Sequence, residues 1–190
     1  MDITPPSLWA LTGERGIGKT TFCRTLVELA LTAGWDVAGL LSPAVFEGGV
    51  KTGILVENLR GGETQPLACA ALSLSLQPAT FDLQLGSWLF SSAALAWGNQ
   101  VLGSSLACDL LIVDELGPLE FLRGEGWVNA LEALCHSHYR LGLVVIRPEL
   151  LETAREILPI TQVIAIDAFD NLTLQAQDWW KTMRTNPNRS

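Results

Sequence analysis

Apolar and polar positions alternate along most of the chain in a way that predicts strands and helices in turn. Short apolar runs predict strands at residues 7–11, 36–41, 110–113, 141–146 and 162–166. Apolar residues at helical spacing predict helices at residues 19–33, 126–139, 150–158 and 171–182. This order predicts an α/β fold whose mostly parallel sheet is flanked by helices.

The middle of the chain departs from this alternation and predicts an antiparallel extension of the sheet. Residues 45–47 and 50–59 flank a Gly-Gly pair, which is typical of a β-hairpin. Leucines and serines alternate over residues 72–76 and predict a half-buried strand that ends at Pro78. Residues 87–106 are mostly apolar and predict a helix interrupted by Gly98 and Gly103. The chain of 190 residues is therefore expected to form one domain, residues 1–183, with this insertion at about residues 43–106. The polar tail, residues 184–190, is expected to be flexible.

The amino-acid composition excludes several classes of protein. Hydrophobic residues make up 48% and charged residues 17%, which excludes a disordered chain and a charged coiled coil. The net charge of −8 argues against a nucleic acid partner, which needs a basic face. Lysine and arginine are absent between Gly61 and Leu122.

Nothing in the sequence indicates export or a membrane span. No two of the four cysteines are spaced as a C-x-x-C pair, which argues against a zinc or redox site. The first twelve residues lack a basic region that would indicate a signal peptide, and no apolar run reaches about 18 residues. We therefore expect a cytoplasmic protein with reduced thiols.

A glycine-rich segment between the first strand and the first helix fits G-x-x-x-x-G-K-[ST] completely. The predicted phosphate-binding residues are Gly13, Glu14, Arg15, Gly16, Ile17, Gly18, Lys19, Thr20 and Thr21. Glycines let successive backbone N–H groups converge on phosphate oxygens, and the following helix adds its positive end. Lys19 supplies a charge for the β- and γ-phosphates, and the Thr20 hydroxyl supplies a ligand for Mg²⁺.

A second motif follows the apolar run at residues 110–113, where Asp114 and Glu115 stand together. Carboxyl ends of parallel strands face the ligand crevice of such sheets. Asp114 is therefore predicted to hold Mg²⁺ with Thr20, and Glu115 to orient or activate the attacking water.

Residues 114–120 read Asp-Glu-Leu-Gly-Pro-Leu-Glu. In these residues and in residues 11–21, the chain resembles the small P-loop nucleoside-triphosphatases first described from thermophiles, which have an animal cancer-related counterpart. The resemblance spans roughly residues 11–120. It implies a RecA-like fold and slow Mg²⁺-dependent hydrolysis of nucleoside triphosphates with loose base selectivity. Lys19 and Thr20 would bind phosphate and metal, Asp114 would hold Mg²⁺, and Glu115 would activate water.

Three positions depart from the family pattern. The second hairpin strand reads Lys51-Thr52-Gly53-Ile54, which keeps the usual basic residue but lacks the usual aromatic residue after glycine. No arginine follows the last strand, where residues 167–171 read Asp-Ala-Phe-Asp-Asn, which leaves the base contacts open. Arg147 and Pro148 stand where the family more often has small or hydroxyl residues.

Several other side chains are candidates for the site. Arg147 follows a predicted strand at its carboxyl end and is a candidate catalytic arginine, with a surface ion pair to Glu149 as the alternative. Arg15 and Arg123 are further candidates for an arginine finger. His136 and His138 are expected on one helix, about 200° apart, which disfavours a shared metal.

Seven tryptophans are many for this length. Trp179 and Trp180 are adjacent on a predicted helix, so both are not expected to face inward. The apolar surface that bears them is a candidate contact for a protein partner or a second copy of the chain.

The sequence thus predicts an enzyme that hydrolyses ATP, GTP or similar nucleotides with Mg²⁺. The first alternative is a nucleotide or small-molecule kinase, which is disfavoured because the region available for a lid, residues 65–106, has no arginine. The second alternative is a nucleotide-binding switch or accessory subunit without catalysis, suggested by the apolar surface.

Overall fold

One mixed β-sheet runs through the computed structural model, which describes residues 7–71, 81–104, 107–167 and 171–185. Its order is β10-β1-β9-β8-β2-β4-β5-β7-β6, and β3 pairs with β4 beside this path. The strands are β1 (Ser7–Thr12), β2 (Val37–Leu41), β3 (Ala44–Glu47), β4 (Val50–Asn58), β5 (Thr64–Ala70), β6 (Leu83–Leu85), β7 (Trp88–Phe90), β8 (Ala107–Leu116), β9 (His138–Ile146) and β10 (Ile160–Ala165). The helices are α1 (Lys19–Thr32), α2 (Ser92–Ser104), α3 (Val128–His136), α4 (Leu151–Ile157) and α5 (Leu172–Thr185), with a short π-helix η2 (Leu119–Arg123) and a 3₁₀ turn η3 (Pro148–Leu150).

The sheet has a parallel half and an antiparallel half. Strands β10, β1, β9, β8 and β2 are parallel neighbours. Strands β4, β5, β7 and β6 continue the sheet with antiparallel pairings. The prediction of a mostly parallel core with an antiparallel hairpin extension is thus confirmed, and all parallel strands end at the same edge.

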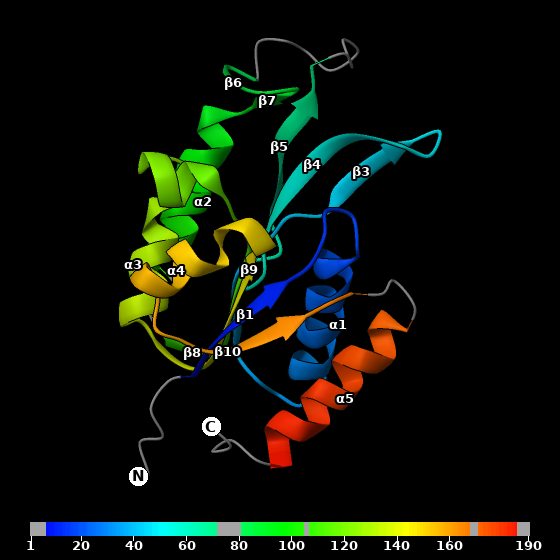
Figure 1. Cartoon of the computed structure of the whole chain (residues 1–190), viewed down its shortest axis with the longest axis vertical. Coiled ribbons are helices and arrows are strands. Elements are labelled where there is room, and N and C mark those ends of the chain that lie inside the picture. Colours follow the sequence, from blue (N-terminus) through cyan, green and yellow to red (C-terminus); the bar gives the residue numbers. More distant parts are fainter. Residues whose placement is uncertain (1–6, 72–80, 105–106, 168–170, 186–190) are drawn as a thin grey trace.

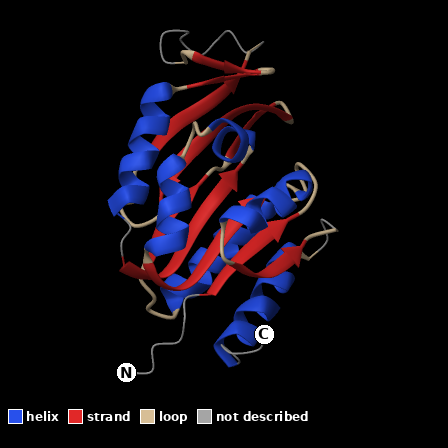
Figure 2. Ribbon diagram, turned by 60° about the vertical axis from the view of Figure 1, so that its left-hand side comes forward, coloured by secondary structure: helices blue, strands red, loops and turns tan. Residues whose placement is uncertain are grey.

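Helices cover both faces of the parallel half. Figure 1 shows α1 and α5 on one side, and Figures 1 and 2 show α2, α3 and α4 gathered on the other. Each face of the sheet carries a buried hydrophobic core beneath its helices. The apolar residues of β8 alternate between these two cores. Leu110 and Ile112 pack toward α1 and α5, whereas Leu111 and Val113 pack toward α2 and α3. A strand buried on both faces therefore appears in the sequence as a continuous apolar run.

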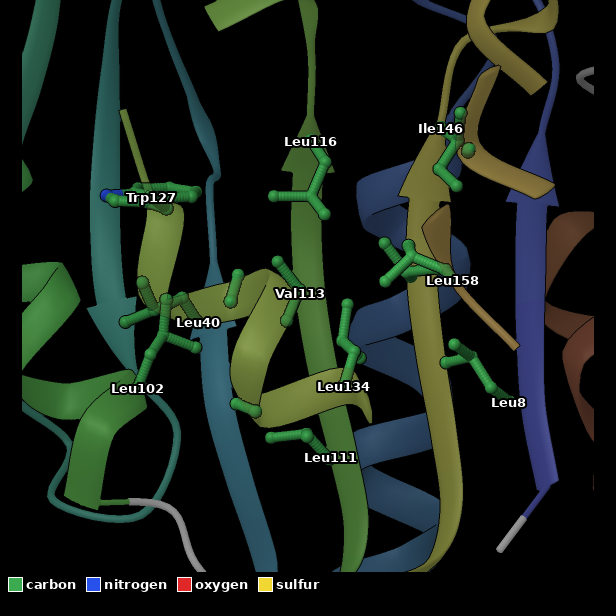
Figure 3. Close-up of a cluster of buried hydrophobic side chains, with 14 of the residues drawn as sticks. Leu8, Leu40, Leu102, Leu111, Val113, Leu116, Trp127, Leu134, Ile146 and Leu158 are labelled. Carbon is green, nitrogen blue, oxygen red and sulfur yellow. The ribbon is translucent and has the colours of Figure 1, made fainter. Parts of the chain in front are cut away.

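The core beneath α2 and α3 is drawn in Figure 3. Leu40 of β2 and Leu102 of α2 lie close to Trp127, whose indole fills the space between helix and sheet. Gly98 of α2 faces the same indole, because a Cβ there would lie 2.7 Å from Trp127 Nε1 and 3.1 Å from Leu40 Cδ1. Gly98 was expected to interrupt this helix, but α2 is continuous over Ser92–Ser104 and Gly98 is a packing residue within it.

This contact predicts opposite effects for two glycines of α2. Gly98→Ala is expected to lower the free energy of unfolding by about 1–3 kcal/mol, because the added methyl group overpacks the core. Gly103→Ala is the matched control, since its Cβ would meet only Asn129 Nδ2 at 3.4 Å. It is expected to stabilise the protein by about 0.5–1 kcal/mol through helix propensity. Denaturant unfolding of both variants checks this; equal effects of either sign would show that Gly98 has no packing role.

Several predicted element boundaries were wrong. The helix predicted at residues 87–106 begins only at Ser92, because Trp88–Phe90 forms β7 against β5. Asp82 caps the true start by accepting a 2.8 Å bond from the Ser92 N–H. The next helix begins at Val128 and ends at His136, so His138 belongs to β9, where it pairs with Ala107, and not to the helix of His136.

Other differences concern strands and the end of the chain. Strand β5 was not predicted, because Pro66 stands inside it, next to an irregularity in its pairing with β4. Strand β8 runs from Ala107 to Leu116, which is longer at both ends than the apolar run at residues 110–113, and it includes Asp114 and Glu115. Helix α5 extends to Thr185, beyond the predicted start of the tail. The strand predicted at residues 72–76 lies outside the described residues.

The two adjacent tryptophans of α5 both pack against the molecule itself, contrary to the prediction. Trp179 meets Trp9 of β1 edge to face, with ring centroids 5.3 Å apart, and Trp180 meets Trp35 at 4.9 Å. The rings are large enough to reach the sheet from both flanks of the contact face, so adjacency on the helix does not force one outward.

No helix in the described part of the chain is long and apolar enough to cross a membrane.

Candidate active site

The glycine-rich loop joins β1 to α1 at the carboxyl edge of the parallel strands. Its glycines Gly13, Gly16 and Gly18 all have positive φ angles, which favour glycine. A Cβ on Gly13 would lie 2.5 Å from the carbonyl oxygen of Ile166, which follows β10. Gly18 adopts a left-handed conformation, with φ of 99°, at the N-cap of α1. The loop therefore presents backbone amides and the start of a 14-residue helix to the same space.

Lys19 folds back across this loop. Its Nζ donates hydrogen bonds to the carbonyl oxygens of Gly13 (2.6 Å) and Glu14 (2.9 Å). The residue is only 6% exposed, which is unusual for a lysine and is made possible by these bonds. The ammonium group is therefore held at the centre of the loop, where the sequence places a phosphate.

Asp114 of β8 connects this strand to the phosphate loop through a hydrogen bond. Its Oδ2 accepts a hydrogen bond from Thr20 Oγ1 at 2.8 Å and another from the Ser42 N–H at 3.2 Å. The Ser42 hydroxyl in turn donates to the Asp114 carbonyl oxygen. Asp114 is 3% exposed, and burial raises its pKa to about 6, although the bonds from Thr20 and Ser42 act in the opposite direction.

Glu115, the next residue, is held by an arginine. Arg147 follows β9, and its Nε and Nη2 lie 2.9 Å and 2.7 Å from the same atom, Glu115 Oε1. No described residue forms a hydrogen bond with Glu115 Oε2, so that oxygen is available to accept one. The surface ion pair considered for Arg147, with Glu149, does not form; its partner is the catalytic candidate itself.

Glu120 stabilises the segment that follows β8. Its two carboxylate oxygens accept hydrogen bonds from the backbone N–H of Gly117 (2.8 Å) and of Trp127 (2.9 Å). Burial raises the pKa of Glu120, while these two donors act to lower it. The last glutamate of the Asp-Glu-Leu-Gly-Pro-Leu-Glu run thus ties the end of β8 to the start of α3, a structural role that the sequence did not reveal.

The remaining predicted residues differ in their relation to the site. Ile17 packs on the core beneath α1, and Thr21 begins the exposed face of that helix. Arg15 is exposed on the loop. Arg123 ends the π-helix and is exposed, and no hydrogen bond or ion pair in the described residues joins it to Asp114 or Glu115.

The oxygen donors around Asp114 suit Mg²⁺. The carboxylate of Asp114 and the hydroxyl of Thr20 already lie 2.8 Å apart, and both are hard oxygen ligands. Mg²⁺ is usually held by one or two such protein ligands, with water and substrate phosphates completing its shell. Among the described residues, no group of three His, Cys, Asp or Glu side chains forms a metal site of the all-protein kind.

Two residues that form hydrogen bonds near this edge, Ser42 and Glu120, were not among the predicted site residues. Ser42 directly follows the predicted strand at residues 36–41, so its place at the carboxyl edge was a usable signal. The role of Glu120 depends on the path of the chain from Gly117 to Trp127, which no spacing rule indicates.

The phosphate loop follows β1, and the strand that carries Asp114 and Glu115, β8, ends at the same edge of the sheet. Strand β9 lies between these two strands. This arrangement defines the class of P-loop NTPases with a RecA-like core. The sequence model of the NTPase family matches residues 9–171, and the chain belongs to this family. It is thus a hydrolase of the nucleoside-triphosphatase type, as the resemblance implied.

Related proteins agree with this placement. The chain is 28% identical over 130 residues to nucleoside-triphosphatase THEP1 of Methanosarcina acetivorans, covering 67% of this chain and 69% of that protein. It is 32% identical over 111 residues to THEP1 of Ignicoccus hospitalis, covering 58% and 59% of the two chains.

Two solved structures share the fold. A human cancer-related nucleoside triphosphatase superposes with a TM-score of 0.67 at 20% identity, covering 97% of this chain and 100% of that one. THEP1 from the hyperthermophile Aquifex aeolicus gives a TM-score of 0.58 at 19% identity, covering 90% and 96%.

Proposed function

We propose that the chain hydrolyses nucleoside triphosphates such as ATP and GTP to the diphosphate and phosphate, with Mg²⁺ as cofactor. The observation that carries this proposal is the position of Glu115 beside the Thr20–Asp114 pair, with Oε1 held by Arg147 and Oε2 free. A fixed carboxylate with one open oxygen, next to a phosphate loop, is suited to orient a water molecule.

Binding of the triphosphate rests on the loop. Backbone amides from Glu14 to Thr20 and the ammonium of Lys19 would receive the phosphate oxygens. Lys19 would exchange its two carbonyl acceptors, Gly13 and Glu14, for phosphate. Mg²⁺, held through Thr20 and Asp114, would neutralise the charge that develops on the phosphates.

Hydrolysis then requires an oriented nucleophile. Water would donate a hydrogen bond to Glu115 Oε2, and its oxygen would form a bond to the γ-phosphorus as the bond from that phosphorus to the bridging oxygen breaks. The electron pair of the broken bond stays on the diphosphate, and the proton of the water passes through Glu115 to solvent or phosphate. Arg147 would fix the carboxylate and offer positive charge beside the transferring group.

The experiment that tests this proposal is the release of phosphate from ATP, GTP, CTP and UTP with no acceptor molecule present. Release from several nucleotides is expected, because the family resemblance implies loose base selectivity. Turnover that appears only when a phosphoryl acceptor is added would identify a kinase, and binding without any turnover would identify a switch.

A further inference from the structure

The end of β8 departs from regular strand pairing where it carries its two acidic residues. Val113 and Leu116 of β8 pair with Val144 and Ile146 of β9, so residues 114–115 lie opposite a single residue of β9. Val113 and Leu116 also pack into the same core, although residues three apart in a regular strand face opposite sides. A β-bulge of this kind accommodates one extra residue and re-aims the side chains that it carries.

Because of this bulge, the segment at Asp114 is held by something other than regular ladder pairing. The pairing of β8 with its other neighbour, β2, ends at Val113. Ser42, the residue after β2, supplies two donors to Asp114: its N–H bonds Oδ2 at 3.2 Å, and its hydroxyl bonds the carbonyl oxygen. That carbonyl belongs to the peptide that joins Asp114 to Glu115. One hydroxyl group thus holds the link between the two acidic residues.

Ser42 is itself fixed from both sides. It follows β2, all five residues of which are buried. The next residue, Pro43, accepts a hydrogen bond of 2.9 Å at its carbonyl oxygen from the N–H of Leu55 in β4. The ring of Pro43 also restricts the backbone of Ser42 to extended conformations. The hydroxyl is therefore presented to β8 from a rigid junction between β2 and the β3–β4 hairpin.

We propose that Ser42 is a positioning residue, whose hydroxyl orients the Asp114–Glu115 peptide so that Asp114 can hold Mg²⁺ and Glu115 can face the attacking water. The proposal rests on the function proposed above and adds a residue to it. Oδ2 of Asp114 accepts both the Thr20 hydroxyl and the Ser42 N–H, and no hydrogen bond within the described residues reaches Oδ1. That oxygen is left for a metal ion, and its direction depends on the peptide that Ser42 holds.

This role predicts a selective loss of metal affinity. Ser42→Ala removes the hydroxyl and keeps the N–H that bonds Asp114. Electron paramagnetic resonance can follow Mn²⁺, in place of Mg²⁺, binding to protein that carries a non-hydrolysable triphosphate analogue. We expect Mn²⁺ binding to be weakened about 10-fold, as is usual when a residue that orients a metal ligand is lost. Affinity for the analogue without metal should stay within about 2-fold, and Ser42→Thr should restore Mn²⁺ affinity to within about 3-fold.

Turnover tests the effect on Glu115 separately. At saturating Mg²⁺ and nucleotide, Ser42→Ala is expected to release phosphate about 10-fold more slowly, with KM for the nucleotide within about 2-fold, because Glu115 shares the peptide that has lost its support. Ser42→Thr should recover most of this rate. A wild-type rate in Ser42→Ala under these conditions would overturn the role assigned to Ser42 in orienting Glu115.

A matched control separates positioning from general stability. Ser104→Ala removes a serine hydroxyl that donates to the Val101 carbonyl oxygen at 2.8 Å in α2, and it should change neither metal nor nucleotide affinity. Both alanine variants should unfold thermally within about 4 °C of the wild type.

The binding measurements decide the proposal by themselves. Wild-type Mn²⁺ affinity in Ser42→Ala would overturn it. Equal weakening of metal-free nucleotide binding, or failure of Ser42→Thr to restore Mn²⁺ affinity, would overturn it in favour of a purely structural role. Because neither titration requires turnover, they test the role of Ser42 even if the wild-type protein releases no phosphate, a result that would contradict the proposed hydrolysis alone.

Discussion

Replacing Glu115 by glutamine is expected to lower the rate of phosphate release by about 10²–10⁴-fold, with nucleotide affinity within about 3-fold of the wild type. Glutamine has nearly the same shape but cannot accept a proton from water, and its amide group would have to share the space beside Arg147. The phosphate loop, Lys19 and the Thr20–Asp114 pair would be unchanged. Single-turnover phosphate release and direct nucleotide titration measure the two quantities separately.

Glu149→Gln is the matched control for this change. Glu149 is exposed two residues beyond Arg147, so the control removes a carboxylate of the same kind close to the site. It is expected to leave the rate within about 2-fold of the wild type. If Glu115→Gln hydrolysed nucleotide at the wild-type rate, another group would have to orient the water.

The second large effect concerns the phosphate loop. Lys19→Ala is expected to weaken binding of a triphosphate by about 10²-fold or more, because it removes the charge held at the centre of the loop. It also leaves the carbonyl oxygens of Gly13 and Glu14 without their donor. Nucleotide titration of the variant measures the loss directly, and turnover should fall with it.

Two comparisons make the Lys19 result interpretable. Lys181→Ala on α5 controls for the loss of a positive charge elsewhere and should bind nucleotide normally. Circular dichroism of Lys19→Ala should retain the wild-type spectrum, because the core beneath α1 does not depend on the ammonium. A folded Lys19→Ala protein with wild-type affinity would show that triphosphate binds elsewhere.

The parallel half of the fold was predictable because its inner strands β2, β8 and β9 are largely buried on both faces. Residues 110–113 form a continuous apolar run, and helices with a clear apolar face separate such runs. The antiparallel half was predicted less well. Strand β5 contains Pro66, and β7 is only three residues long and apolar enough to resemble the start of the helix that follows. Local pattern does not distinguish these cases, because pairing with distant strands decides them.

The candidate site shows the same division. Lys19, Thr20 and Asp114 belong to two short motifs, so the sequence alone predicted that they lie at one site, and the bond between Thr20 and Asp114 joins the two motifs. The bond between Arg147 and Glu115 joins the ends of two strands that are 32 residues apart in sequence. It depends on β9 lying next to β8, which the order of elements did not establish.

Phosphate release from ATP, measured with and without Mg²⁺ and with no acceptor present, is the decisive test of the proposed hydrolysis. We expect steady release with Mg²⁺, a loss of at least about 10²-fold when a chelator removes Mg²⁺, and comparable release from GTP, CTP and UTP. Undiminished release in the presence of the chelator, or no release from any of the four nucleotides, would contradict it.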